Sequence, residues 1–364
     1  MKKLAVLIAM TMAIVCLLTG CTGTIVVINE CDCPEATQIP SATPAANESA
    51  SSGIAGSLPV KTGLSVSVAV GDSISAAEGQ DGAVKYDVTI VAVTVDDRNV
   101  ITACYIDSIP ATVNMDATGA ILSDITAEVP TKNELGPAYG MVAWGKAKAE
   151  WNEQAAALAG YAVGKTVEEL KNGAIDETGR APEGSDLASS ASIYLGGYVS
   201  AIEAAVNNAH FAGAQAGDTL TVATINSLKN SVAATAEANG TAQLDADIAV
   251  VTSNNGVITS CIIDSVQAKI SFDAAGVITT DLTTPILTKN ELGANYGMVA
   301  WGKAKAEWNE QAAAFAAYVT GKTADEVAGI AINEATKPAD GSDLASSVTI
   351  SIGGFQGLIE KAMK

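Results

Sequence analysis

The sequence predicts an α+β fold built from two tandem repeats, each an antiparallel sheet followed by helices. Three observations predict it. A stretch of 27 residues that starts at Thr131 recurs at Thr288 with 25 identical positions. Before each copy, apolar and polar residues alternate in short runs, which is typical of half-buried strands. Within and after each copy, apolar residues recur three or four positions apart, as on one face of a helix.

The N-terminal residues 1–20 are predicted to be an export signal. Lys2 and Lys3 precede an apolar run that is too short and wrongly flanked for a stable membrane span. The sequence Leu18-Thr19-Gly20-Cys21 resembles the lipobox of bacterial lipoproteins, in which the cysteine becomes the lipid-bearing first residue. The resemblance implies lipidation of Cys21 and an anchor on the extracytoplasmic face of the cell membrane, because several acyl chains on one residue anchor stably. An ordinary secretory peptide with an incidental cysteine is the alternative.

Residues 21–61 are predicted to be a flexible linker. The segment is rich in Ser, Ala, Pro, Thr and Gly, so it buries too little apolar surface to offset its ordering entropy. Cys31 and Cys33 could form a strained disulfide, take part in metal binding, or be incidental. A metal site is disfavoured because no second Cys or His pair lies nearby.

The chain is strongly acidic, with a formal net charge of −20 that becomes −22 once Lys2 and Lys3 are removed with the signal. Such a charge favours solubility and disfavours binding to nucleic acid or to anionic lipid headgroups.

A constant offset of 157 residues places Val100 to Gly197 onto Val257 to Gly354. We therefore predict repeats over residues 62–209 and 216–364, separated by a linker containing His210. Turn sequences such as Asp-Ala-Thr-Gly and Asn-Asn-Gly predict hairpins between the strands. Cys104 and Cys261 occupy equivalent strand positions, where a free cysteine acts as a small core hydrophobe. A bond between these two cysteines is the alternative.

Each repeat is predicted to continue into three helices. The first follows from an apolar stripe with helical spacing, ended by Gly164 or Gly321. The second is short and is capped by Thr166 or Thr323. The last begins at Asp186 or Asp343 and contains paired glycines. The stripe residues are Trp144, Ala147, Trp151, Ala155, Leu158 and Ala162, with Trp301, Ala304, Trp308, Ala312, Phe315 and Val319 in the second copy.

The polar sequence TKNELG opens the repeated stretch and precedes its first helix. Loops where a sheet passes into helices often carry function. The Trp stripe behind it is more typical of a core, and a recent duplication would preserve the stretch without any function. Both interpretations stay open.

The last predicted helices begin with DLASSAS, Asp186 to Ser192, and DLASSVT, Asp343 to Thr349. Asp and Ser could simply cap the helix. Together with the preceding strands, however, the segment resembles the bacterial FMN-binding domain family, whose corresponding segment reads Asp-x-x-Ser-Gly-Ala-Thr or Ser. In that family a separate flavin transferase attaches FMN to the last hydroxyl. Both copies depart from the pattern, with Ser190 and Ser347 in place of its Gly and Val348 in place of its Ala.

The resemblance implies that Ser192 and Thr349 are the FMN acceptors. The orienting residues that it implies are Asp186, Ser189, Asp343 and Ser346. A phosphodiester on the first turn of a helix would meet unpaired N–H groups and a favourable dipole. Tyr139, Met141, Tyr296 and Met298 are expected to pack near the isoalloxazine ring.

The sequence thus leads us to expect a surface lipoprotein that holds FMN, covalently or transiently, and passes electrons to a redox partner outside the membrane. The alternative is a non-redox ligand-binding or adhesion lipoprotein that kept the fold and lost the flavin. An electron carrier or binding protein is favoured over a catalyst. His210 is the only histidine and lies between the repeats, so neither repeat contains a Ser-His-Asp or Cys-His catalyst. No catalytic or metal-binding residue is predicted.

Overall fold

The computed structural model describes residues 58–364, and all of these belong to one compact unit. The predicted signal peptide, Cys21, Cys31, Cys33 and most of the predicted linker lie outside the described residues. Strand β1 begins at Pro59, so it includes the last residues of that linker. Within residues 58–364, no helix is long and apolar enough to cross a membrane.

The described strands form two antiparallel sheets. One has the order β3-β2-β1-β4 and the other β5-β6-β7. Their bounds are Pro59–Ala69 for β1, Gly82–Val95 for β2, Ile101–Met115 for β3, His210–Gln215 for β4, Thr219–Ser227 for β5, Gly240–Asn254 for β6 and Val257–Phe272 for β7. The predicted linker around His210 is therefore a strand, β4, which pairs with β1. We call residues 62–209 the first half and residues 216–364 the second half.

The helices of each half follow its strands, so the predicted α+β class of sheets followed by helices is confirmed. In the first half they are α1 Lys132–Leu135, η1 Gly136–Tyr139, α2 Trp151–Ala162, α3 Val167–Ala174, α4 Asp186–Ser190 and α5 Gly196–Asn207. In the second half they are α6 Lys289–Leu292, η2 Gly293–Tyr296, α7 Trp308–Val319, α8 Ala324–Ala328, η3 Leu344–Ser346 and α9 Gly353–Ala362.

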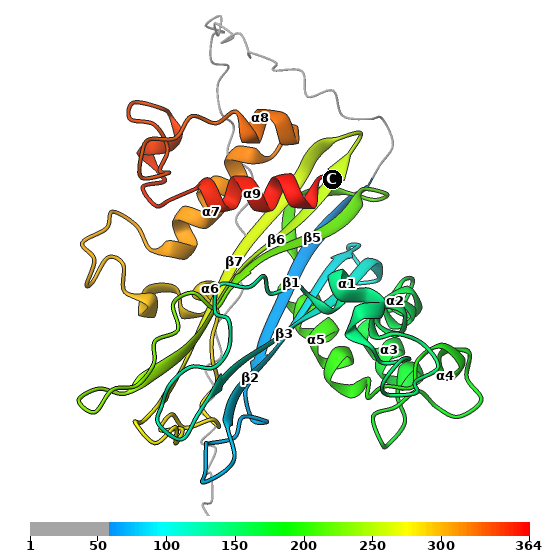
Figure 1. The fold of residues 1–364 in the computed structure, drawn as a ribbon. Helices are drawn as coiled ribbons and strands as arrows, with labels where there is room; N and C mark the ends of the chain where they lie inside the picture. The colour runs from blue at the N-terminus through cyan, green and yellow to red at the C-terminus, as the bar shows by residue number, and fades with distance from the viewer. Residues whose placement is uncertain (1–57) are drawn as a thin grey trace, which may run out of the picture. The chain divides into compact units, whose positions relative to one another are not determined.

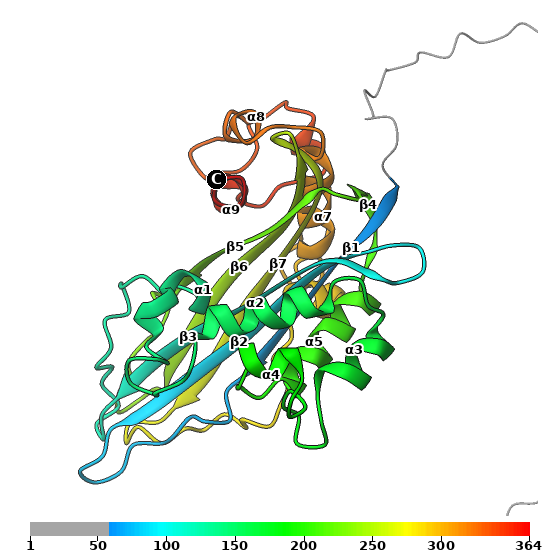
Figure 2. The same cartoon turned by 90° about the vertical axis from the view of Figure 1, so that its right-hand side faces the viewer.

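The elements stack in four layers. Helices α2 and α5 cover the sheet of the first half, α7 and α9 cover the sheet of the second half, and the two sheets face each other. Figures 1 and 2 show the two groups of helices on opposite sides of the strands. Because each sheet is covered on both sides, its strands need apolar residues on both faces. In β2, Ile90 points into the core between the sheets, and Val91 points into the core under the helices.

The two halves share the core between the sheets. Val88 and Ile90 from one sheet pack in the same cluster as Leu244 and Ile248 from the other. Polar contacts cross the same boundary, because the Tyr86 hydroxyl donates to the Ala242 carbonyl at 2.8 Å. The halves are therefore held together by a buried apolar layer, the kind of contact that dominates stability.

In each half, two predicted helix starts differ from the structure. Helix α2 begins at Trp151, and α7 begins at Trp308, whereas Trp144 and Trp301 lie in loops with 85% and 87% of their surface exposed. The apolar spacing therefore extended the helix about two turns too far. The last helices begin at Gly196 and Gly353, well after the DLASS segments. The predicted caps are confirmed, since Thr166 and Thr323 accept from the backbone of α3 and α8.

Cys104 and Cys261 are free thiols, as the core interpretation predicted. They belong to different apolar clusters, one beneath the helices of each half. The alternative of a disulfide bond between them is therefore wrong. Burial raises the pKa of both thiols to about 12, which makes them unreactive.

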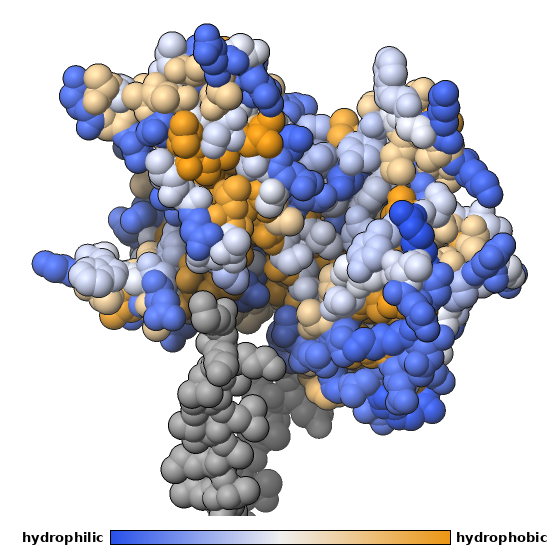
Figure 3. Space-filling model, turned by 90° about the horizontal axis from the view of Figure 1, so that it is seen from below, coloured by the Kyte–Doolittle hydropathy of each residue, from blue (hydrophilic) through white to orange (hydrophobic). Residues whose placement is uncertain are grey.

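Hydrophilic side chains dominate the outer parts of the face shown in Figure 3, and apolar side chains gather between them.

Candidate functional site

The repeated TKNELG sequence folds into a capped helical turn in each half, α1 against strand β3 and α6 against strand β7. Thr131 Oγ1 accepts from the backbone N–H of Glu134 at 3.2 Å, and the Glu134 carboxylate accepts from the N–H of Thr131 at 2.8 Å. Thr288 and Glu291 make the same reciprocal pair in the second half. This capping box stabilises a turn too short to persist alone.

A buried aspartate fixes each turn to its sheet. Asp107 Oδ1 accepts from the N–H of Asn133 at 3.1 Å, and the Asn133 side chain donates to the Ile106 carbonyl at 3.0 Å. Asp264 and Asn290 repeat the arrangement. Burial raises the pKa of both carboxyls, and that of Asp264 reaches about 6. The sequence pattern did not reveal this anchor, although Asp and Asn recur at matching positions of both copies.

The turn places a lysine between two aromatic rings. Lys132 Nζ lies 5.4 Å from the centre of the Tyr139 ring and 5.2 Å from that of Trp151, and it pairs with Asp87 at 3.2 Å. Burial alone would lower the pKa of Lys132, but the charge of Asp87 and the neighbouring tyrosines outweigh it and raise the pKa. The lysine is therefore charged and nearly buried, with only 5% of its side chain exposed. Such a cation against aromatic faces is stabilising.

Lys289 occupies the same place in the second half, 5.3 Å from Tyr296 and 4.8 Å from Trp308. Among the described residues, no carboxylate lies within ion-pair distance of it. The sequence did not single out either lysine. Only the fold brings one aromatic ring from the 3-10 turn and one from the next helix against each lysine.

A buried glutamine links the repeated stretch to the FMN-like motif. Gln154 is only 1% exposed, and its Oε1 accepts from the N–H of Ser192 at 2.7 Å, the N–H of Ile193 at 3.1 Å and the Ser192 hydroxyl at 3.2 Å. In the second half, Gln311 accepts from the N–H and the hydroxyl of Thr349 at 2.7 and 3.0 Å. One amide oxygen therefore engages each predicted FMN acceptor.

The predicted placement of Ser192 and Thr349 on the first turn of the last helix is wrong. Ser192 follows the five-residue helix α4 and precedes α5, and Thr349 lies between η3 and α9. The N–H groups that would meet a phosphate at Ser192 already donate to Gln154. The predicted orienting hydroxyls bond locally, Ser189 to the Asp186 carbonyl at 2.6 Å and Ser346 to the Asp343 carbonyl at 2.7 Å.

The first half contains an open cavity of about 460 Å³ beside this motif. We call it the aromatic pocket and define it by Lys132, Tyr139, Met141, Trp151, Tyr194 and Tyr198. Tyr139 and Met141, predicted to lie near a flavin, both line it, and so does Ile193, the neighbour of Ser192. Trp151 and Tyr198 stack edge to face with ring centres 5.9 Å apart, and the Trp151 ring N–H donates to the Tyr198 hydroxyl at 3.1 Å.

The second half offers different side chains at the corresponding positions. With the 157-residue offset, Ser351 corresponds to Tyr194 and Phe355 to Tyr198. Tyr296 and Met298 pack against the core beneath α7 and α9, where Trp308 and Phe355 have ring centres 5.9 Å apart. The structure thus brings Tyr139 and Met141 together at a cavity whose rim includes Tyr194 and Tyr198, positions that hold Ser351 and Phe355 in the second half.

Comparisons with known proteins give no relative. No family model matches the chain, and searches of curated proteins and of solved structures find no similar protein. Among residues 58–364, no group of three or more His, Cys, Asp or Glu side chains could hold a metal ion.

Proposed function

We propose that this protein binds a planar, ring-containing molecule in the aromatic pocket of the first half. The observation that carries the proposal is the gathering of Tyr139, Trp151, Tyr194 and Tyr198 around one open cavity. Aromatic faces stack on planar rings, and tyrosine hydroxyls at the rim supply hydrogen bonds. Lys132, whose charge is paired with Asp87, lies against the Tyr139 ring and helps to fix that ring at the pocket.

FMN is the member of this ligand class that the sequence resemblance suggests. In this proposal FMN is held transiently, because Gln154 occupies the hydroxyl and backbone N–H groups of the predicted acceptor Ser192. The protein then acts as an electron carrier that exchanges electrons with a redox partner. Covalent attachment by a flavin transferase at Ser192 or Thr349 is the stronger form of the same idea and is tested with it.

We further propose that the carrier is a lipoprotein anchored to the extracytoplasmic face of the cell membrane through lipidated Cys21. The signal-like residues 1–20 and the lipobox-like Leu18 to Cys21 support this location. The net charge of −20 supports partners other than nucleic acid.

The two halves are proposed to be repeats of one ancestral domain. The 157-residue offset and the paired contacts of Asn133 with Asp107 and Asn290 with Asp264 support this. The unequal side chains at Tyr194 and Ser351 suggest that only the first repeat kept the ligand site.

The second candidate is a non-redox binding or adhesion lipoprotein that lost the flavin. The engagement of Ser192 by Gln154 and of Thr349 by Gln311 favours it, because these bonds close the motif in both halves. It uses the same pocket for a different ring, such as that of a sugar.

Titration with FMN tests the proposal, because stacking on tyrosine or tryptophan quenches flavin fluorescence. Tyr194→Ser and Tyr198→Phe give the pocket the side chains of the second half, and we expect about tenfold weaker binding from the pair, a loss of about 1.4 kcal/mol. Tyr318→Ser, on α7 and outside the pocket, is the matched control and should bind as the wild type does. Quenching that these variants leave unchanged would contradict the pocket.

Intact mass after co-expression with a flavin transferase tests the covalent form. We expect an unmodified mass. An FMN addition that disappears in Ser192→Ala or Thr349→Ala would establish covalent attachment instead. If the titration shows no quenching and the mass shows no FMN addition, the flavin is excluded and the non-redox candidate remains. The same variants then serve with sugar probes.

A further inference from the structure

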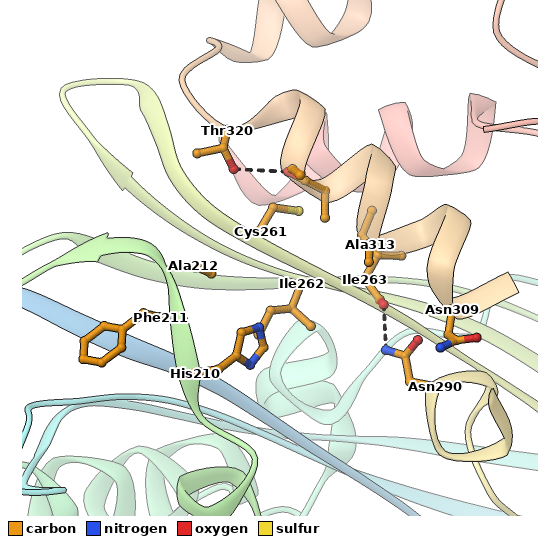
Figure 4. A pocket seen from close by; sticks show the side chains of 12 residues that line it. His210, Phe211, Ala212, Cys261, Ile262, Ile263, Asn290, Asn309, Ala313 and Thr320 are labelled. Carbon is orange, nitrogen blue, oxygen red and sulfur yellow. Dashed lines mark hydrogen bonds between the residues drawn. The ribbon is translucent and has the colours of Figure 1, made fainter. Parts of the chain in front are cut away.

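Two tryptophans lie almost fully exposed on the surface. Trp144 and Trp301 have 85% and 87% of their surface exposed, more than the other large apolar side chains of residues 58–364. Other exposed aromatic side chains line cavities, Tyr194 in the aromatic pocket and Phe211 in the cavity between β4 and α7 that Figure 4 shows. The two tryptophans line neither of these cavities.

Each of these tryptophans belongs to a loop of the same sequence. We call residues 140–149 and 297–306, both of which read GMVAWGKAKA, the tryptophan loops. Val142 and Val299 are 44% and 45% exposed, and the alanine between valine and tryptophan is exposed in both loops. Each loop therefore presents a contiguous apolar tip to its surroundings, and exposed apolar patches mark contact sites.

The first loop is held in one conformation. The buried Glu150 carboxylate accepts from the N–H groups of Met141 and Val142 at 2.8 and 3.1 Å. The Trp144 N–H donates to the Gly140 carbonyl at 2.9 Å, and a Cβ at Gly140 would lie 2.2 Å from the Trp144 ring. Because the loop is already fixed, a contact made by its tryptophan loses little conformational entropy.

The second loop has the same hydrogen bonds. The Glu307 carboxylate accepts from the N–H groups of Met298 and Val299 at 2.8 and 3.1 Å. The Trp301 N–H donates to the Gly297 carbonyl at 2.9 Å. The chain thus presents the same rigid apolar tip twice, once in each half.

The charged side chains of the tryptophan loops are all lysines. Lys146 and Lys148 in the first loop, and Lys303 and Lys305 in the second, are exposed. None of them belongs to an ion pair among the described residues. Each loop therefore carries two unpaired positive charges, although the whole chain has a net charge of −20. Salt screens the net charge beyond about 8–10 Å, so the loop lysines dominate at close contact.

This composition fits a lipid surface better than a glycan. A sugar stacked on tryptophan needs neighbouring polar side chains that accept hydrogen bonds from its hydroxyl groups. The tryptophan loops contain no Asn, Asp, Gln, Glu, Ser or Thr. At a bilayer surface, by contrast, tryptophan lies at the level of the headgroups, and lysines are attracted to anionic lipids.

We propose that the tryptophan loops bind a membrane surface that contains anionic lipids, with Trp144 or Trp301 inserted among the headgroups. Each loop is a complete contact, so one loop suffices for binding. The site needs neither a ligand in the aromatic pocket nor the lipidation of Cys21.

Vesicles test the proposal with residues 54–364, the compact unit that contains all three apolar cores but lacks Cys21 and the signal-like segment. The vesicles are an equal mixture of phosphatidylcholine and phosphatidylglycerol. We expect the tryptophan emission to move to shorter wavelength and to be quenched by brominated acyl chains. Trp151 and Trp308, which are 3% and 6% exposed, give a constant background.

Tryptophan variants separate the two loops. Trp144→Ser and Trp301→Ser should each keep the emission shift of the exposed tryptophan that remains. The double variant should lose the shift and bind vesicles at least about tenfold more weakly in sedimentation. Both side chains are exposed, so these variants should unfold at the temperature of the wild type.

Lysine variants test the local charge. Lys148→Glu combined with Lys305→Glu should weaken vesicle binding at least about tenfold. Lys229→Glu combined with Lys337→Glu makes the same change of net charge at exposed positions outside the loops, and it should weaken binding less than about twofold.

The absence of vesicle binding by the wild-type unit would overturn the proposal, and so would unchanged binding in the double tryptophan variant. Equal losses in the two pairs of lysine variants would overturn the role of the loop charges. An emission shift with polygalacturonate, an acidic polysaccharide, but none with vesicles would assign the loops to a glycan instead.

Discussion

At the scale of single residues, a buried amide holds the loop that resembles a flavin attachment segment. Gln154 Nε2 donates to the Ala149 carbonyl at 2.8 Å, while its Oε1 accepts from Ser192 and Ile193. The identical WNEQ sequence in both copies is therefore explained without a cofactor, because Gln311 makes equivalent bonds. The pattern alone could not reveal this, since the partners lie 38 residues apart.

Replacing Gln154 by alanine should lower the free energy of unfolding by about 2 kcal/mol, because two partly buried backbone N–H groups lose their acceptor. Hydrogen exchange of the Ser192 and Ile193 amides should accelerate. Gln215→Ala, on β4, serves as the control and should leave exchange at these two amides unchanged. Wild-type exchange rates in Gln154→Ala would contradict the anchoring role.

The buried Asp264 predicts a pH dependence of stability. Burial raises its pKa from 3.8 to about 6, so the folded protein binds this proton more tightly than the unfolded chain does. Ionising the buried carboxyl lowers the free energy of unfolding. This loss is absent below about pH 4, grows between about pH 4 and pH 6, and is constant at about 3 kcal/mol above that.

Urea denaturation of Asp264→Asn at about pH 4 and pH 7 should therefore show a smaller fall in stability with rising pH than the wild type shows. The exposed Asp281 is the control. Thr283 hydrogen bonds lower its pKa, so its stabilisation is lost as pH falls and Asp281→Asn cannot remove the effect. An unaltered pH profile in Asp264→Asn would refute the assignment.

At the scale of elements, strands and turns followed their sequence signals closely, whereas two helix starts did not. Alternation placed β2 and β3, and Asn99 and Asn255 take the positive φ that the predicted hairpin turns require. Trp144 fits the helical spacing but lies in a loop that Glu150 fixes by accepting from the N–H groups of Met141 and Val142. Glu150 is the N-cap of α2 and forms a capping box with Glu153, whose carboxylate accepts from the N–H of Glu150 at 2.8 Å. This box starts α2 at Trp151.

The hairpin turns also connect the halves. Gly276 follows β7 with a φ of +70°, and its carbonyl accepts from the N–H of Ala76 at 2.9 Å. A Cβ there would overlap Asp116 and Ala76 of the first half, whereas Gly256, with a φ of +78°, has open space around it.

Gly276→Ala should therefore destabilise the protein by at least about 2 kcal/mol more than Gly256→Ala, which suffers only the strain of a positive φ. Thermal or urea unfolding of both variants measures the difference. Equal losses would show that the turn does not press against the other half.

At the scale of the whole described unit, the two halves behave as one hydrophobic assembly. The layer containing Val88, Ile90, Leu244 and Ile248 belongs to neither half alone. Further bonds cross between halves, such as the Asn226 side chain to the Val129 carbonyl at 2.9 Å and the ion pair of Lys361 with Glu134.

Unfolding should therefore be a single cooperative transition, with equal calorimetric and van't Hoff enthalpies. Residues 62–209 expressed alone should bind a dye for exposed apolar surface, because one face of their sheet loses its cover. Two separate unfolding transitions, or an isolated first half that binds no dye, would mean that the shared apolar layer contributes little to stability.

By itself, the sequence determined the α+β class, the hairpin strands β2 and β3 with β6 and β7, the short capped helices, and the packing of Cys104 and Cys261 as free core thiols. These follow from local spacing and turn chemistry, which act over a few residues. Only the tertiary structure decided that the sheets share a core, that Gln154 engages Ser192, and that Lys132 lies between Tyr139 and Trp151. Such contacts join residues distant in the chain, and their free energy comes from packing and desolvation that no local pattern encodes.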